Sequence, residues 1–337
     1  MSAPAVSPSD YRAVTEACGL VDRSDRGKLA LTGVDAKRFM QGQVTNDVEA
    51  LRPGAGCYAA FLTPKGKMLG DVRILDAGME RIEDGGSGPV VPGTGEPVQV
   101  LLLDTERVAL QELFNMVRRF SIGYDVQLHK QTLQKGLLSL VGPAAAEIAA
   151  IDGLPEDEDA HLPAEVDGIA ARAVRTDLGI DLICDAADTD ALARALERRG
   201  AEPVAESAAD CVRIERGRPR FGIDLDDTVI PQEADLNQRA VSFTKGCYVG
   251  QETVARLYYR GKPNRRLRGV RLAEPAWTGA EIMFGDRAVG RLGSVTESPV
   301  LGAIALAIVR REAPPGSHVR VGSDRIQGVV VELPFAA

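Results

Sequence analysis

The segment from Lys245 to Glu252 holds a single cysteine, Cys247, between Gly246 and Gly250, two residues after Lys245. Glycine allows the backbone to turn sharply or to approach a ligand closely. A thiol beside a cation has a lowered pKa, which makes the reactive thiolate available. A cysteine in such a turn can equally be a small buried side chain. The segment therefore predicts either a functional thiol or a packed cysteine, and its chemistry alone leaves both open.

A run of carboxylates lies upstream, within Arg213–Pro219, Phe221–Asp224 and Ile230–Glu233. A carboxylate can accept two hydrogen bonds from a ligand with paired N–H donors, such as a pterin. Glu233 is the candidate for that contact, although acids that follow proline are also common loop residues. The anionic tail of a folate would need cations, and the stretch 256–271 supplies seven of them without an acid.

Two further segments, 41–47 and 65–71, end in aspartates. Thr45, Asn46 and Asp47 can simply close a helix and begin a turn, and that reading is favoured. Asp71 falls on a predicted strand, where aspartate is disfavoured. A strand aspartate usually has a partner or a task, so Asp71 is a candidate functional carboxylate.

The composition indicates a water-soluble protein of 337 residues with 45% hydrophobic and 26% charged residues. No apolar run approaches the length of a membrane helix, and residues 1–10 do not resemble a secretory signal. Five scattered cysteines argue against a disulfide framework and favour a cytoplasmic location. Without a Cys-x-x-Cys pair or clustered histidines, a metal site made by this chain alone is not expected. The net charge of −8 argues against a stable nucleic-acid complex.

The patterns along the chain predict an α+β fold. Residues 130–205 read as a ferredoxin-like part with an acidic loop over 152–167, and Thr105 reads as a helix cap. The stretch 84–97 is rich in Gly and Pro and reads as a flexible surface insertion. After a boundary near residue 264, short strands separated by Gly/Pro turns predict a small antiparallel barrel over 265–337. Residues 1–264 then form the other unit, made of two interleaved α+β subdomains.

These residues together resemble the YgfZ-type folate-binding proteins, relatives of the glycine-cleavage T-protein (aminomethyltransferase). The resemblance covers nearly the whole chain. Its most specific part is the Lys-Gly-Cys-aromatic-x-Gly-Gln-Glu signature at 245–252, and the other matching pieces are Gln43 to Asp47, Asp71, Arg213 to Glu215, Gly222 to Asp224 and Pro231 to Glu233.

The resemblance implies three lobes around a central channel that binds tetrahydrofolate, or a derivative of it, as cofactor. It also implies an accessory role in assembling or repairing iron–sulfur clusters, including those of tRNA-modifying enzymes, with iron–sulfur proteins or cluster-assembly factors as partners. The residues expected to act in catalysis are Cys247, Lys245 and Asp71. Those expected to bind the cofactor are Glu233, Asn46, Asp47, Tyr248, Gln251, Glu252, Arg260 and Arg266.

Two alternatives remain open. The T-protein branch typically has adjacent aspartates where this chain has Gly70 and Asp71, and the first of them is its expected catalytic carboxylate. Gly70 offers no such group, which argues against aminomethyl transfer, although Asp71 could serve a one-carbon transferase. A nucleic-acid-binding module built on 256–271 and its tyrosines is the third hypothesis, which the overall acidity disfavours.

Overall fold

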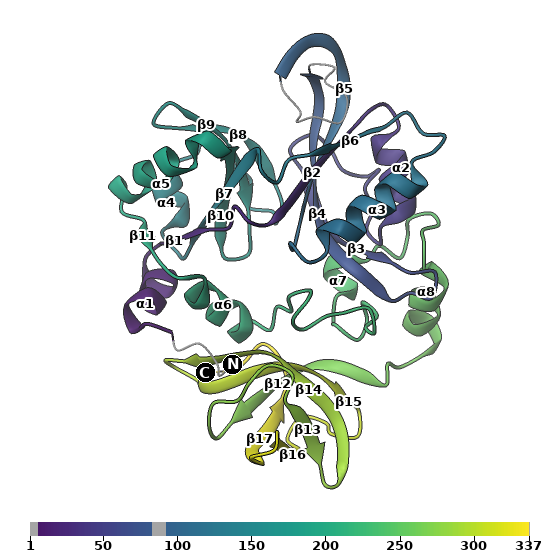
Figure 1. Ribbon diagram of the computed structural model, residues 1–337, viewed down its shortest axis with the longest axis vertical. Coiled ribbons are helices and arrows are strands. Elements are labelled where there is room, and N and C mark those ends of the chain that lie inside the picture. Colours follow the sequence, from purple (N-terminus) through teal and green to yellow (C-terminus); the bar gives the residue numbers. More distant parts are fainter. Residues whose placement is uncertain (1–5, 83–91, 337) are drawn as a thin grey trace.

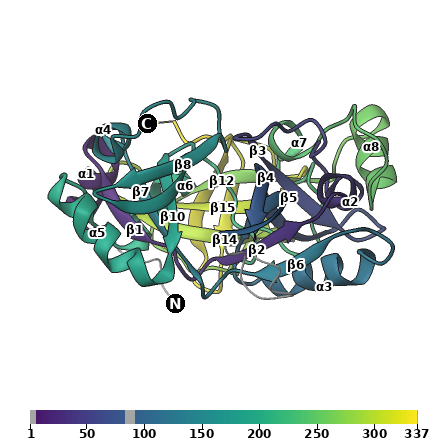
Figure 2. The same cartoon turned by 90° about the horizontal axis from the view of Figure 1, so that it is seen from above.

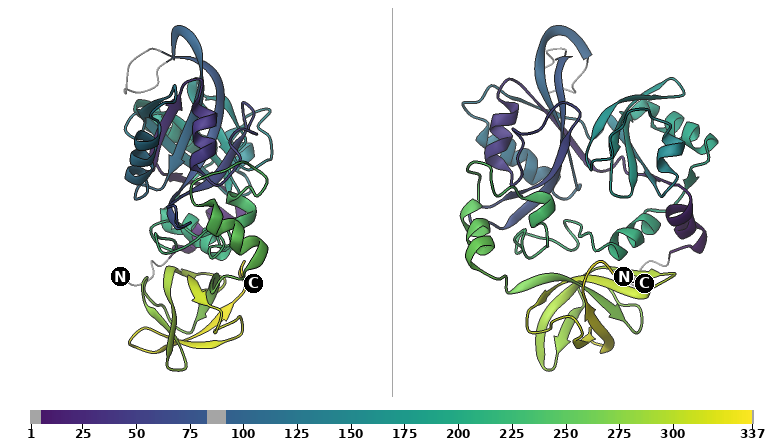
Figure 3. Two further views of the ribbon diagram at one scale, coloured as in Figure 1. Left: turned by 90° about the vertical axis from the view of Figure 1, so that its right-hand side faces the viewer. Right: turned by 180° about the vertical axis from the view of Figure 1, so that it is seen from behind.

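The computed structural model describes residues 6–82 and 92–336. Two lobes, each built on one β-sheet, lie side by side above a C-terminal barrel (Figure 1). The barrel lies beneath the two lobes when the molecule is seen from above (Figure 2), and the view from behind shows the same three parts (Figure 3). The three-lobed arrangement expected from the sequence is therefore confirmed.

The first lobe contains a five-stranded sheet with the order β3-β4-β5-β2-β6. Its elements are β2 (Gly27–Thr32), α2 (Ala36–Gln43), β3 (Gly56–Leu62), β4 (Met68–Ile82), β5 (Pro92–Thr105), α3 (Leu110–Phe120) and β6 (Gln127–Lys130). Helix α3 buries Leu113, Met116 and Val117, which the helical period places on one face. These side chains and those of α2 pack on one face of the sheet. The other face carries Asp71 and Arg73, which line a cavity, beside the apolar Ala60 and Leu62 of a second cluster.

The second lobe contains a six-stranded sheet with the order β11-β1-β7-β10-β9-β8. Its elements are β1 (Gly19–Asp22), β7 (Lys135–Val141), α4 (Ala145–Ala149), β8 (His161–Val166), β9 (Ile169–Arg175), β10 (Gly179–Asp185), the short helix η1 (Ala186–Asp188), α5 (Thr189–Arg198) and β11 (Glu202–Pro203). Strand β1 pairs with β7, so a segment near the N-terminus completes a sheet whose other strands come from 135–203. The chain then crosses to the first lobe at β2, and this crossing interleaves the two lobes.

Two local predictions were wrong. The expected acidic loop over 152–167 contains strand β8, which forms a hairpin with β9 through Asp167 and Gly168, both at positive φ. An Asp-Gly pair is a strong hairpin signal, which the surrounding acids obscured. Thr105 ends β5 and does not cap a helix, because its hydroxyl donates to the Asp71 carbonyl of the neighbouring strand. Most of the insertion predicted over 84–97 lies outside the described residues, and its end, from Pro92, belongs to β5.

The barrel is closed and antiparallel, with the order β12-β15-β14-β13-β16-β17. Its strands are β12 (Arg265–Leu272), β13 (Glu281–Phe284), β14 (Arg287–Ser298), β15 (Gly302–Arg310), β16 (His318–Val321) and β17 (Ile326–Val331). The expected α+β class with a C-terminal antiparallel barrel is thus confirmed. Its interior is filled mainly by Val, Ile, Leu and Ala side chains.

Four helices lie outside these three units in the part of the chain that the structure describes: α1 (Pro8–Glu16), α6 (Glu206–Glu215), α7 (Asn237–Ala240) and α8 (Gln251–Arg260). Helices α6 and α7, and the segment that joins them, lie between the upper lobes and the barrel (Figure 1). Among the described residues, none of the helices is long and apolar enough to cross a membrane.

Candidate functional site

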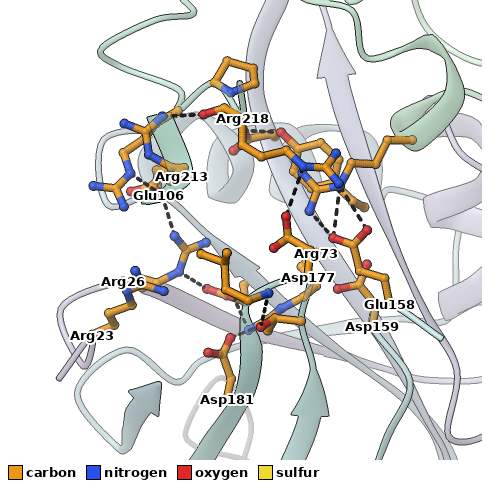
Figure 4. Close-up of a pocket in the computed structure, with 18 of the residues that line it drawn as sticks. Arg23, Arg26, Arg73, Glu106, Glu158, Asp159, Asp177, Asp181, Arg213 and Arg218 are labelled. Carbon is orange, nitrogen blue, oxygen red and sulfur yellow. Dashed lines mark hydrogen bonds and ion pairs between the residues drawn. The ribbon is translucent and has the colours of Figure 1, made fainter. Parts of the chain in front are cut away.

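A cavity of about 170 Å³ opens where the two lobes meet the segment that follows α6. Strands β3, β4 and β5 form one wall, and residues 158–181 of the second lobe form another. The rest of the lining comes from residues 213–220 and from Arg23, Arg26, Glu106, Val141 and Arg239. Seven arginines and seven carboxylates face this space, so the wall is highly charged and formally neutral (Figure 4). A site of this kind suits a polar ligand with both donor and anionic groups.

Strand β4 contributes two charged side chains to the cavity wall. Asp71 and Arg73 are two residues apart, so they share one face of the strand, and both line the cavity. A side chain at Gly70 would instead point into the core, where a Cβ atom would lie 2.4 Å from the ring of Phe61 and 2.8 Å from Ala109. Within this fold, a carboxylate at position 70 would therefore not face the cavity, whereas Asp71 does.

Most charges in the wall neutralise one another. Arg73 forms ion pairs with Asp104 at 2.7 Å and with Asp181 at 2.7 Å, and Arg26 holds the other oxygen of Asp104 at 2.8 Å. Arg26 and Arg73 together keep the pKa of Asp104 low even though the group is buried. Elsewhere in the wall Arg218 pairs with Asp177 at 3.0 Å (Figure 4). Arg239 pairs with Glu158.

Two of the lining carboxylates, Asp71 and Asp159, form no ion pair within the described ranges. Burial raises the pKa of Asp71 to about 6, and a hydrogen bond of 2.6 Å from the Tyr58 hydroxyl opposes that rise. Burial also raises the pKa of Asp159 to about 6, against the attraction of Arg73. These two groups are buried acceptors that a ligand with N–H donors could reach.

The signature segment is anchored by Lys245, whose ammonium donates to the carbonyls of Gln41, Val44 and Asn46 at 2.6, 2.8 and 2.7 Å. Burial lowers the pKa of Lys245 to about 8, so the group remains a cation at neutral pH. Its donors are occupied by the backbone of the segment 41–46. In this structure Lys245 therefore positions the loop that carries Cys247.

Asn46 and Asp47 belong to the same anchor. The Asn46 amide donates to the carbonyls of Tyr58 at 2.9 Å and Arg239 at 3.2 Å, and the Asp47 carboxylate accepts from the Gln41 amide at 2.9 Å. Arg239 lies over the ring of Tyr58 at 4.6 Å, and both side chains line the cavity. Asn46 thus connects the signature segment to Tyr58 and Arg239 of the cavity wall.

Cys247 is the exposed member of the five cysteines, all of which lie in described ranges. Tyr248, the next residue, is buried in a cluster of apolar side chains between the first lobe and 225–254. Gly250 has φ +84° and caps α8, which begins with Gln251 and the exposed Glu252. The chain therefore turns Cys247 outward between two buried anchors, Lys245 and Tyr248.

Two family descriptions match this chain. The GCVT N-terminal domain matches residues 3–82, and the glycine cleavage T-protein C-terminal barrel domain matches residues 265–336. Both descriptions belong to the glycine cleavage T-protein superfamily, and this chain is similar to it at both ends. The YgfZ-type subgroup within it is a finer assignment that these matches do not make.

Relatives that match most of this chain point to the same superfamily. An aminomethyltransferase of Rubrobacter xylanophilus is 29% identical over 338 residues, which are 97% of this chain and 85% of the relative. A chloroplastic protein of Arabidopsis thaliana, provisionally named a transferase, is 28% identical over 331 residues, covering 94% and 71% of the two chains. The crystal structure of the glycine cleavage system aminomethyltransferase T from Bartonella henselae superposes with a TM-score of 0.81 at 22% identity, over 99% of this chain and 91% of that one, which supports the T-protein fold.

Glu233, the expected pterin ligand of this T-protein-like chain, is not among the residues that line the cavity. Both of its carboxylate oxygens accept hydrogen bonds from Arg265, at 3.0 and 2.9 Å, at the first residue of the barrel. Its backbone carbonyl also accepts from Leu267. In the structure Glu233 therefore joins the loop before α7 to the barrel.

The segment 213–224 of the T-protein-like core makes a second junction with the barrel. Ser294 of β14 donates to Asp224 at 2.7 Å and accepts from Arg213 at 2.7 Å. Glu215 accepts from Ser298, on the same strand, at 2.6 Å. Residues 213–220, which line the cavity, are thus held in place against the barrel.

The remaining candidates, Arg260 and Arg266, are exposed and do not line the cavity. The sequence analysis missed several of the residues that do, namely Tyr58, Arg73, Asp104, Asp159, Asp181 and Arg239. A signal was present for Arg73, since it lies two residues from Asp71 on a predicted strand and must share its face. Asp104 and Asp181 are likewise charged residues within strands.

Proposed function

We propose that this chain binds tetrahydrofolate, or a derivative of it, in the cavity and serves in the cytoplasm as an accessory protein for assembling or repairing iron–sulfur clusters, including those of tRNA-modifying enzymes. The observation that carries the proposal is the exposure of Cys247 on a loop that Lys245 anchors. An enclosed thiol would serve a small substrate, whereas an exposed thiol on a rigid turn can reach a site on another protein.

The cavity offers suitable groups for a folate. A pterin presents an amino group and a ring N–H that can meet one carboxylate in a two-pronged hydrogen bond. Asp71 and Asp159 are buried carboxylates without an ion pair in the described ranges, and the arginines around them suit the anionic tail. Glu233 would become available to a pterin only after Arg265 releases it.

Cys247 would act as one ligand among several. A single thiolate cannot complete the four-ligand set of a cluster, so a partner protein supplies the rest. The thiol loses its proton when it binds iron, and it takes the proton back when the cluster leaves. Because solvent reaches Cys247 in the observed fold, this step requires no rearrangement of the chain.

The test of the thiol is complementation of a strain deficient in cluster repair by Cys247→Ala. We expect the variant to fold normally and to fail in complementation. Thr244→Ala, an exposed substitution in the same loop, is the matched control and should complement fully. Full complementation by Cys247→Ala would remove the thiol mechanism.

Calorimetry with tetrahydrofolate tests the cavity. A buried hydrogen bond to a charged acceptor contributes about 1.5 to 3 kcal/mol, so Asp159→Asn should raise the Kd by about tenfold or more. Glu233→Ala tests the alternative position of the pterin. A loss of affinity in Glu233→Ala alone would place the pterin at the Arg265 junction and not in the cavity.

A one-carbon transferase is the second candidate, and the position of Asp71 favours it. Asp71 lies in the cavity, hydrogen-bonded to Tyr58, and Gly70 occupies a core position where a catalytic carboxylate would be misplaced. Turnover of an aminomethylated carrier protein with tetrahydrofolate, lost in Asp71→Asn, would establish this reading. Absence of turnover in the wild type would exclude aminomethyl transfer to that carrier.

A further inference from the structure

Helix α8 presents an aromatic and basic surface next to the Cys247 loop, at the edge of the molecule (Figure 1). Tyr258 is 48% exposed and Tyr259 is 66% exposed. The ring of Phe243 stacks on that of Tyr258 at 3.7 Å, and Tyr259 meets Tyr258 edge-on at 5.0 Å. The stack holds large aromatic side chains in fixed positions at the surface, which is a property of interaction sites.

The charge around these rings is the reverse of that of the whole chain. Arg256, Arg260 and Lys262 are exposed, and none forms an ion pair among the residues that the structure describes. Lys65 adds a fourth exposed cation, because the turn it belongs to packs against Thr253 of α8. Glu252 is the exposed acid of the helix. This surface is therefore positive on a protein of net charge −8.

We infer that the α8 surface, defined by Lys65, Arg256, Tyr259, Arg260 and Lys262, is a docking site for the acidic face of a partner protein. Unpaired cations around exposed tyrosines match a negatively charged protein surface in sign, and tyrosine and arginine are the residues that most often dominate such interfaces. That the partner is an iron–sulfur protein rests on the proposed function of Cys247, whereas the docking surface itself does not.

Cys247 lies close enough to the α8 surface for one partner protein to contact both. Cys247 precedes α8 by four residues, and a ten-residue helix is about 15 Å long. A standard protein interface covers a larger patch than this. One partner that rests on α8 can therefore also reach the exposed thiol.

The ring geometry favours a protein over single-stranded nucleic acid. Bases bind to aromatic side chains by stacking on an open ring face. One face of Tyr258 is covered by Phe243 and its edge region by Tyr259, so the cluster satisfies its own stacking. The rings offer a compact contact area and do not form a ladder for successive bases.

The experiment measures binding of the full chain to a plant-type [2Fe–2S] ferredoxin, a small iron–sulfur protein with a strongly acidic surface, at low ionic strength. We expect the Arg256→Glu/Arg260→Glu variant to raise the Kd by about 30-fold or more and Tyr259→Ala by about tenfold. The matched control is Arg118→Glu/Arg119→Glu, which reverses two exposed charges at the C-terminal end of α3 and should change the Kd by less than about twofold. Unchanged thermal unfolding of each variant shows that it is folded.

The proposal is overturned if the wild type does not bind the ferredoxin, or if both double reversals weaken binding equally. It is also overturned if the α8 variants lose affinity for a uridine oligonucleotide while ferredoxin binding persists, because the surface would then serve RNA. Cys247→Ala separates this inference from the proposed function. If Cys247→Ala fails to complement while the α8 variants bind ferredoxin as the wild type does, the docking site is ruled out and the thiol mechanism stands. If Cys247→Ala complements fully while the α8 variants lose ferredoxin binding, the thiol mechanism is ruled out and the docking site stands.

Discussion

The cavity wall and the Cys247 loop both contain charged side chains, but the two regions hold them differently. In the wall, Arg73 bridges Asp104 and Asp181 from two lobes, so these three charges are neutralised by partners far away in sequence. In the loop, Lys245 lies on backbone carbonyls of one neighbouring segment. The wall is thus a structural network with two spare carboxylates, whereas the loop is an anchored support for an exposed thiol.

This difference separates stability from function. Substitutions in the wall should cost folding free energy, because they leave buried charges without a partner. Substitutions at the exposed end of the loop should cost activity and little stability. Four measurements test that separation, from the largest expected effect on stability to the smallest.

Arg73→Met should cause the largest loss. It leaves Asp181 buried without its cation and deprives Asp104 of one of two, and breaking a buried pair in this way costs about 3 to 5 kcal/mol. Urea denaturation measures the free energy of unfolding. The exposed Arg118→Met is the control and should stay within about 0.5 kcal/mol of the wild type. A loss below about 1 kcal/mol for Arg73→Met would mean that the network does not hold the two lobes together.

Lys245→Met should follow. The substitution removes a buried ammonium group, so three backbone carbonyls lose the hydrogen bonds that it donates. We expect the free energy of unfolding to fall by about 3 kcal/mol. Lys262→Met, an exposed substitution near the end of α8, provides the comparison. If Lys245→Met were as stable as the wild type but lost its activity, Lys245 would act on the thiol and not as an anchor.

The sequence predicts the parts of this arrangement that local patterns encode. Alternating apolar residues and Gly/Pro turns mark the barrel strands, and an aspartate on a strand marks Asp71. The exposure of Cys247 follows in part from its flanking glycines, which allow the chain to turn between Lys245 and Tyr248. Strand β8 escapes detection because acidic residues dominate its surroundings.

The pairing of distant charges could not be predicted in the same way. Arg73, Asp104 and Asp181 come from three strands in two lobes, and their meeting depends on strand register and on how the lobes pack. Glu233 also shows that a motif identifies a residue without showing its contacts. The motif identifies the residue, but only the position of β12 shows that Arg265 occupies its carboxylate.

The spare carboxylate Asp71 should make stability depend on pH. The pKa of Asp71 is about 6 in the folded protein, whereas an unburied aspartate has a pKa of 3.8. The folded state therefore binds the proton more tightly than the unfolded chain does. The contribution of Asp71 to unfolding free energy is therefore fully present below about pH 4 and is lost as pH rises through about 6, by about 3 kcal/mol. The difference in unfolding free energy between wild type and Asp71→Asn should fall across that range.

Tyr58→Phe sharpens the same measurement. The Tyr58 hydroxyl donates to Asp71 and favours its charged form, so removing it should raise the pKa of Asp71 further and move the transition to higher pH. A difference between wild type and Asp71→Asn that is independent of pH would show that Asp71 is not buried as a spare carboxylate.

Cys247→Ala should change stability least, by less than about 0.5 kcal/mol, because the side chain is exposed. Alkylation of the native wild type should modify Cys247 first, with the buried Cys18, Cys184 and Cys211 reacting only on unfolding. Mass spectrometry of the labelled peptides measures that order. A destabilised Cys247→Ala, or slow labelling of Cys247, would make this cysteine a packed side chain and would give the loop the same structural role as the cavity wall.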